Sequence, residues 1–176
     1  MLVILGGLPG VGKTTIARRL AAAMPAAHVR IDSIEQALRA DGVDVEGQGY
    51  SVGYAVAEDN LRLGHHVIAD CVNPWPLTRS AWQSAADRAG VQCLLVEVVC
   101  SDAAEHRRRV ETRAPDIPGH SLPTWTDVLQ RDYRPWVGDP LVIDTARLTL
   151  DESVQRILAT AVARPAEPPI RKLGER

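Results

Sequence analysis

The hydrophobic pattern of the chain alternates between two kinds of segment. Short runs rich in aliphatic and β-branched residues predict five strands, at residues 2–5, 27–31, 67–69, 93–100 and 141–143. Longer segments with apolar residues at helical spacing predict helices at residues 14–24, 34–40, 51–63, 77–89, 103–113, 125–133 and 150–163. This alternation is typical of βαβ units, so we expect an α/β fold built on a parallel sheet.

Polar residues mark the starts of several predicted helices and the segments between them. Ser33, Asp102 and Thr149 each precede a Gln or Glu by three residues, the spacing of a capping box. The glycine-rich segment 41–50 and the proline-rich segment 114–123 have no regular period and predict loops. We expect one domain over residues 1–163, followed by an extended proline-rich tail at 164–176.

Composition narrows the class of protein. The 176 residues fit a single α/β domain, and 20 basic against 22 acidic side chains give a formal net charge of -2. No global field therefore draws the protein to nucleic acid or to an anionic membrane. The N-terminal apolar run is too short for a signal peptide, and no run approaches the ~20 apolar residues of a membrane span, so we expect a cytoplasmic protein without a membrane partner.

The sharpest motif joins the first predicted strand to the first predicted helix. It reads Gly7, Leu8, Pro9, Gly10, Val11, Gly12, Lys13 and Thr14, which matches GxxxxGK[ST]. In this motif the backbone amides cradle the phosphates, so we expect Lys13 to contact the β- and γ-phosphates, Thr14 to hold Mg²⁺ and Thr15 to contact the α-phosphate. ATP and Mg²⁺ are the expected cofactors. The alternative is a glycine-rich turn without a ligand, but the chain prefers Arg to Lys elsewhere and uses Lys here.

Two carboxylates follow predicted strands. Asp32 ends the second strand and Asp70 ends the third, and the carboxyl ends of parallel strands meet at one edge of the sheet. Near a nucleotide, one carboxylate can accept the proton of an attacking hydroxyl, and the other can hold magnesium through water. We assign Asp32 the first role and Asp70 the second. The alternatives are a helix N-cap for Asp32 and a turn residue for Asp70.

A run of cations, His106 to Arg109 with Arg113 after it, lies on the predicted helix that precedes the proline-rich loop. Because Arg109 and Arg113 are four residues apart, they share a helix face. They could close over phosphates as part of a lid around residues 107–123. The alternative is a solvated basic face paired with Glu105 and Glu111.

Taken in order, these motifs resemble P-loop kinases of the polynucleotide 5′-kinase type, an AAA-type kinase-like domain. Chloramphenicol phosphotransferase, gluconate kinase, adenylylsulfate kinase and zeta-type toxin kinases look similar. The likeness spans residues 1–163 and rests on the phosphate loop, Arg30 to Ser33, Asp70 to Pro74 with Arg79 and Trp82, and the arginine-rich helix. It implies a three-layer P-loop fold with five parallel strands in the order 2-3-1-4-5. It also implies that Asn73 and Arg79 face the acceptor.

The expected activity is transfer of the γ-phosphate of ATP to a hydroxyl group. A small-molecule acceptor is favoured over a nucleic-acid 5′ end, because the chain lacks a large basic surface. The alternative is a nucleotide-dependent switch or ATPase that acts on a protein partner. The sequence names neither the acceptor nor the oligomeric state.

Overall fold

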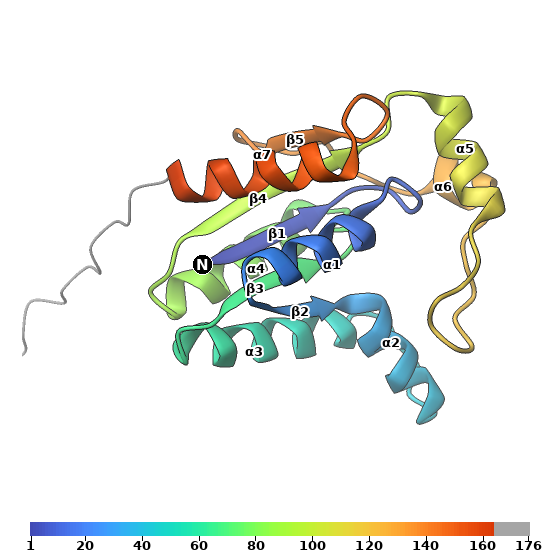
Figure 1. Cartoon of the computed structure of the whole chain (residues 1–176). Coiled ribbons are helices and arrows are strands. Elements are labelled where there is room, and N and C mark those ends of the chain that lie inside the picture. The colour runs from blue at the N-terminus through green and yellow to red at the C-terminus, as the bar shows by residue number, and fades with distance from the viewer. Residues whose placement is uncertain (164–176) are drawn as a thin grey trace, which may run out of the picture.

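The strands of this computed structural model, which describes residues 1–163, form one parallel sheet (Figure 1). They are β1 (Leu2–Gly6), β2 (Ala26–Arg30), β3 (His66–Asp70), β4 (Cys93–Val99) and β5 (Leu141–Asp144). Their order is β2-β3-β1-β4-β5, and each neighbouring pair is parallel. The predicted α/β fold and strand order are confirmed. The predicted proline-rich tail lies outside the described residues.

Within residues 1–163, seven helices connect and flank the strands. They are α1 (Lys13–Ala23), α2 (Ile31–Ala40), α3 (Gln48–Arg62), α4 (Pro76–Arg88), α5 (Ala103–Thr112), α6 (Trp125–Gln130) and α7 (Leu150–Ala163). Each was predicted, but α2 begins three residues earlier than expected, directly at the end of β2. The predicted loop at 41–50 is shorter than expected, because α3 already begins at Gln48. The segment 114–123 contains neither helix nor strand, as its prolines predict.

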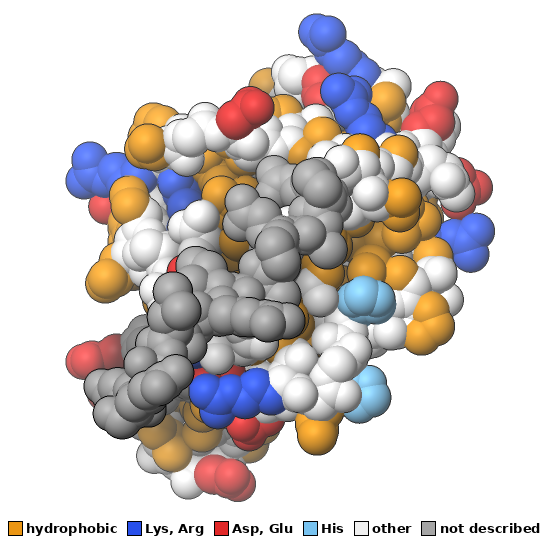
Figure 2. Space-filling view, turned by 90° about the vertical axis from the view of Figure 1, so that its left-hand side faces the viewer, with side chains coloured by type: hydrophobic (Ala, Val, Ile, Leu, Met, Phe, Trp, Pro, Cys, Tyr) orange, Lys and Arg blue, Asp and Glu red, His pale blue; other side chains and the backbone are white. Residues whose placement is uncertain are grey.

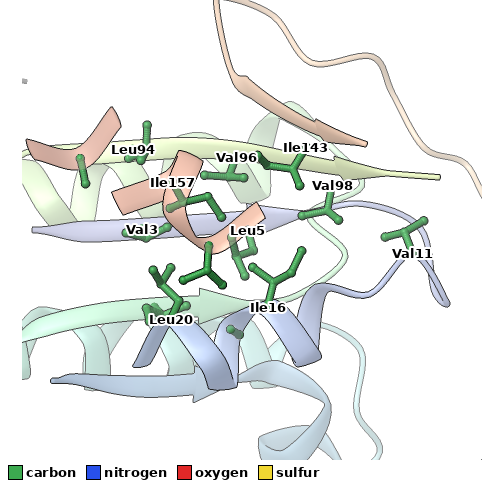
Figure 3. Packing of buried hydrophobic residues seen from close by; sticks show 14 residues of the cluster. Val3, Leu5, Val11, Ile16, Leu20, Leu94, Val96, Val98, Ile143 and Ile157 are labelled. Atoms are coloured by element: carbon green, nitrogen blue, oxygen red, sulfur yellow. The ribbon is translucent and has the colours of Figure 1, made fainter. Parts of the chain in front are cut away.

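The core consists of two apolar layers, one on each face of the sheet. Side chains of β1 alternate between them: Val3 and Leu5 face α1 and α7, whereas Leu2 and Ile4 face α3 and α4. Figure 3 shows the first layer, with strand side chains directed toward α1 and α7. Every residue of β1 is buried, which explains why its sequence is a continuous apolar run.

Helix capping follows the sequence at two of the three predicted positions. The Asp102 carboxylate accepts hydrogen bonds from the amides of Ala104 and Glu105, and Thr149 exchanges hydrogen bonds with Glu152. The prediction for Ser33 is wrong. Since α2 starts at Ile31, Ser33 lies inside the helix, and Arg30 takes the N-cap position without a side-chain cap.

The two ends of the molecule differ. The carboxyl ends of the strands lead into the phosphate loop, α2 and the connection to α5 (Figure 1). Figure 2 shows the opposite end, where acidic and basic side chains are scattered over the visible surface. Among the helices within residues 1–163, none has the length and apolar character needed to cross a lipid bilayer.

Candidate active site

Strand register brings several polar residues together at the carboxyl edge of the sheet. Asp70, the last residue of β3, is aligned with Leu5 of β1 on one side and with Arg30 of β2 on the other. The phosphate loop leaves β1 at this edge, and α2 leaves β2 there. The sheet therefore places Asp70, Arg30 and Asp32 beside the loop, as expected for a ligand site in an open parallel sheet.

The start of α1 has the properties of an anion site. Gly10 and Gly12 adopt φ values of 87° and 102°, a left-handed conformation that favours glycine. Gly12 occupies the N-cap position of α1, and no side chain within residues 1–163 caps this helix. The first amide hydrogens of α1 are thus left without a side-chain acceptor, at the positive end of the helix dipole. An anion such as a phosphate group can satisfy them.

Lys13 completes this cradle. Its side chain is only 8% exposed, and Nζ donates a hydrogen bond to the carbonyl oxygen of Leu8, 2.9 Å away. Burial lowers the pKa of Lys13, and the nearby carboxylates of Asp70 and Asp32 oppose this effect. A buried ammonium that has one carbonyl as its hydrogen-bond partner is well suited to a polyphosphate.

A cavity of about 1610 Å³ runs from the phosphate loop to α2 and the segment 114–123. The loop contributes Pro9, Gly10, Gly12, Lys13, Thr14 and Thr15 to its lining. Asp32, Arg109 and Arg113 line the same cavity. Gly7, Leu8 and Val11 lie behind this surface, and Val11 packs into the core. The cavity therefore joins the predicted phosphate-binding, base and lid residues in one space.

Asp32 occupies the second position of α2. Because Arg30 is the N-cap of this helix, the alternative of an N-cap role for Asp32 is wrong. The carboxylate is 42% exposed, and its Oδ2 atom lies 4.0 Å from Nη2 of Arg30. Asp32 is thus accessible from the cavity and lies beside the guanidinium of Arg30.

Asp70 is more deeply placed than Asp32. It is 2% exposed, and its Oδ2 atom lies 3.1 Å from Nε2 of His28 and 4.0 Å from Nε of Arg30. It does not line the cavity directly. Its alignment with Leu5 places it beside the end of β1, two residues before the phosphate loop begins.

The two predicted lid arginines differ in their partners. Arg109 donates to Glu105 and, through Nη1 and Nη2, to the hydroxyl and carbonyl oxygens of Thr145. Arg113 has a buried Nε atom without a hydrogen-bond partner. Burial lowers the pKa of Arg113, and the negative charge of Asp32 opposes this effect. The solvated-face alternative applies to Arg107 and Arg108, which are exposed and pair with Glu111 and Glu105.

The residues assigned to the acceptor by resemblance lie deeper than expected. Asn73 is fully buried, with a φ of 50°, and its Nδ2 atom donates to the carbonyl oxygen of Leu5. Arg79 is also buried, and its guanidinium donates to the carbonyl oxygens of Asn73, Pro74, Arg134 and Pro135. Neither side chain lines the cavity. Their contacts join the loop after β3 to the loop before β5.

Several contacts of site residues were not predicted from the sequence. His106 donates from Nε2 to the carbonyl oxygen of Pro9, 2.8 Å away, and so packs α5 against the phosphate loop. Asp116, in the segment 114–123, binds Arg18 and Arg30. Arg30 belongs to the sequence motif Arg30 to Ser33, but its contact with Asp116 was not predicted. Asp116 gives no signal in the sequence, because its partners are remote in the chain.

The parallel sheet is covered by helices on both faces, and the phosphate loop with the buried Lys13 leads into α1. These features define a P-loop nucleotide-binding protein with the fold of P-loop kinases. Within this class, a family model described as an AAA domain matches residues 2–131. The chain belongs to this AAA domain family, and the predicted P-loop kinase-like group is confirmed. A comparison with curated proteins finds no match.

Solved structures share the fold at low sequence identity. A candidate kinase from Chloroflexus aurantiacus J-10-fl has a TM-score of 0.71 and 22% identity, covering 90% of this chain and 96% of that one. Kti12 from Chaetomium thermophilum in complex with ADP-AlF3 has a TM-score of 0.67 and 19% identity, with coverages of 90% and 98%. The Mycobacterium tuberculosis APS kinase CysC in complex with AMPPNP and APS has a TM-score of 0.63 and 16% identity, with coverages of 92% and 97%. These likenesses establish the fold, and the function has to be argued from the site.

Proposed function

We propose that this chain is an ATP-dependent kinase that transfers the γ-phosphate to a hydroxyl group of a small molecule. The observation that carries the proposal is the single cavity shared by the phosphate loop, Asp32 and Arg113. Its volume of about 1610 Å³ exceeds the ~300–1000 Å³ of a typical single-ligand pocket. An acceptor thus has room beside a nucleotide.

The nucleotide would bind along the start of α1. The first amides of the helix and Lys13 would bind the β- and γ-phosphates, and Thr15 would contact the α-phosphate. The Thr14 hydroxyl, which lines the cavity, and Asp70, through a water molecule, would hold Mg²⁺. The ion would neutralise charge on the phosphate oxygens when it is bound.

Asp32 would act as the base of the transfer. As the acceptor oxygen bonds to the γ-phosphorus, the bond to the oxygen that bridges the β- and γ-phosphorus atoms breaks, and ADP leaves. The proton of the acceptor hydroxyl passes to the Asp32 carboxylate. Arg113 and Arg109 would stabilise the charge that develops on the transferred group.

Two observations guide the choice of acceptor, and the use of ATP guides the choice of compartment. The formal net charge of -2 gives no general attraction for a nucleic acid, so a polynucleotide end is the less favoured acceptor. The APS kinase with a similar fold was solved with a small molecule, APS, beside a nucleotide analogue. We place the protein in the cytoplasm, in keeping with a kinase that uses ATP.

The test is acceptor-dependent release of ADP. The protein, with ATP and Mg²⁺, is incubated with sugars, sugar acids, nucleosides, antibiotics, adenylylsulfate and 5′-hydroxyl oligonucleotides, and ADP is measured. We expect at least one small hydroxyl compound to stimulate release, and Lys13→Ala to abolish the stimulation. ATP hydrolysis that no acceptor changes, at any concentration, would instead favour a nucleotide-dependent switch.

A further inference from the structure

Two arginines that are remote from Asp116 in the sequence donate hydrogen bonds to its carboxylate. Nη1 and Nη2 of Arg30 donate to Oδ2 and Oδ1 at 2.7 and 2.9 Å, a two-pronged contact, and Arg18 on α1 also donates to Oδ2. The hydrogen bond from Arg30 is the main cause that holds the pKa of Asp116 well below its usual range. The contact therefore persists as an ion pair at neutral pH.

Arg30 has a hydrogen-bond donor that Asp116 does not use. Its side chain is only 11% exposed, and its Nε atom is buried without a hydrogen-bond partner. Arg113 lines the same cavity as Arg30 and Asp116, and its own Nε atom is buried without a hydrogen-bond partner within residues 1–163. We call Arg18, Arg30 and Arg113 the arginine cluster. A planar guanidinium fork matches the two oxygens of a carboxylate, phosphate or sulfate group.

The arginine cluster lies beside the proposed base. Nη2 of Arg30 is 4.0 Å from Oδ2 of Asp32, and all three arginines line the cavity that Asp32 lines. The segment 114–123, which carries Asp116, also lines this cavity. A compound that presents a hydroxyl to Asp32 therefore enters next to the ion pair of Arg30 and Asp116.

Displacement of Asp116 would leave Arg30 poorly compensated. An unpaired charge in a largely buried position is costly, so a ligand that supplies an anion in place of Asp116 is favoured over a neutral ligand. Asp32 and Asp70 each lie 4.0 Å from Arg30, too far for a hydrogen bond. The vacancy is best filled by an anionic group of the incoming compound.

We propose that Arg30 and Arg18 form a subsite for an anionic group of the acceptor, and that Asp116 fills this subsite until the acceptor arrives. The inference rests on the proposed function only in placing the acceptor hydroxyl at Asp32. It assigns the acceptor to the small hydroxyl compounds that also carry a carboxylate, phosphate or sulfate group. Asp116 then acts as an internal competitor, and the segment 114–123 has to move for each acceptor molecule.

The test measures binding of inorganic sulfate by calorimetry, without turnover. The wild-type protein and Asp116→Asn are compared in the presence of Mg²⁺ and excess AMPPNP, so that the phosphate loop is filled. We expect Asp116→Asn to bind sulfate at least about tenfold more tightly, which corresponds to ~1.4 kcal/mol. Adding Arg30→Gln to this variant should abolish the gain. Parallel titrations with acetate and phosphate show which anion the subsite prefers.

Asp151→Asn and Arg19→Gln provide matched controls, because this exposed ion pair involves the neighbouring residue of α1. Both should bind sulfate as the wild type does. Asp116→Ser is the second variant if Asp116→Asn does not fold. The proposal is wrong if the wild type and both Asp116 variants bind sulfate with equal affinity, or if the increase in affinity remains after Arg30→Gln. Either result would show that Asp116 only holds the segment 114–123 in place. Failure of AMPPNP to bind would count against the proposed kinase, and sulfate binding that depends on Arg30 would still test the subsite.

Discussion

Arg109 and Thr145 connect α5 to the phosphate loop. Nη1 of Arg109 donates to the Thr145 hydroxyl oxygen at 2.9 Å, and this hydroxyl lies 2.9 Å from the carbonyl oxygen of Val11, to which it can donate. Arg109 is therefore held in place by α5, the segment after β5 and the phosphate loop. Arg113 lacks such contacts and has an unpartnered Nε atom. The two arginines should accordingly make different contributions to activity.

Arg113→Gln should reduce kcat with little effect on nucleotide affinity. If its guanidinium stabilises charge only during transfer, its loss should lower kcat by ~10²–10³, as removal of a single charge-stabilising donor commonly does. Steady-state kinetics and nucleotide titration check this. Arg109→Gln should weaken nucleotide binding as well, since it also loosens the contact to Thr145. An equal kcat in wild type and Arg113→Gln would remove Arg113 from the mechanism.

Lys13→Ala should abolish turnover while the domain stays folded. The ammonium is buried, so its removal also relieves a desolvation cost, and we expect stability to stay level or rise. Circular dichroism reports the fold, and calorimetry with Mg²⁺ and ATP reports binding. Lys13→Arg is the informative companion, because a planar guanidinium replaces the compact ammonium and should not restore activity. Unchanged turnover in Lys13→Ala would place the nucleotide elsewhere.

Asp32→Asn should keep the fold and lose phosphoryl transfer. Asp32 lies in the first turn of α2, where loss of its charge should cost only ~0.3–1 kcal/mol of stability. An amide cannot accept the proton of the acceptor, so kcat should fall by at least ~10². Asp151→Asn, the same change in the first turn of α7, is the control and should retain full activity. Full activity in Asp32→Asn would show that another group is the base.

Arg79→Met should destabilise the protein rather than alter acceptor recognition alone. The substitution leaves the carbonyl oxygens of Asn73, Arg134 and Pro135 without their donor, whereas that of Pro74 keeps the amide of Arg134. The loop before β5 thus loses its anchor to the Arg79 side chain. We expect a loss of about 3 kcal/mol or more in urea denaturation. Arg88→Met, which removes an exposed pair with Glu58, should cost under ~1 kcal/mol. A raised KM for the acceptor at unchanged stability would instead support the substrate contact expected from resemblance.

The sequence predicts the fold well because the sheet leaves strong local signals. The first strand is buried on both faces and is therefore apolar throughout, and the phosphate loop has a pattern that few other structures require. The start of α2 was misplaced because Ile31 continues the apolar run of β2 into the helix. Strand register then determines which residues share the carboxyl edge of the sheet. Asp32 and Asp70 could therefore be placed at the same edge from the sequence.

The contacts across the site could not be predicted in the same way. Asp116 meets Arg18 and Arg30 across 98 and 86 residues, from a segment with no periodic structure. Arg79 shows the converse problem: its place in a motif pointed to a ligand, while its donors bond to main-chain carbonyl oxygens on two loops. A local pattern does not specify which of several available partners a long, charged side chain meets after folding.

The loop before β5 also packs against Gly6, the last residue of β1, which directly precedes the phosphate loop. A Cβ atom at Gly6 would lie 2.3 Å from Cζ2 of Trp136, whose indole ring is held beneath the guanidinium of Arg79. A side chain at residue 6 therefore requires Trp136 to move or to be replaced by a smaller residue, so substitutions at the two positions are coupled. The loop before β5 thus limits the size of the side chain just before the phosphate loop, although the two segments are more than a hundred residues apart.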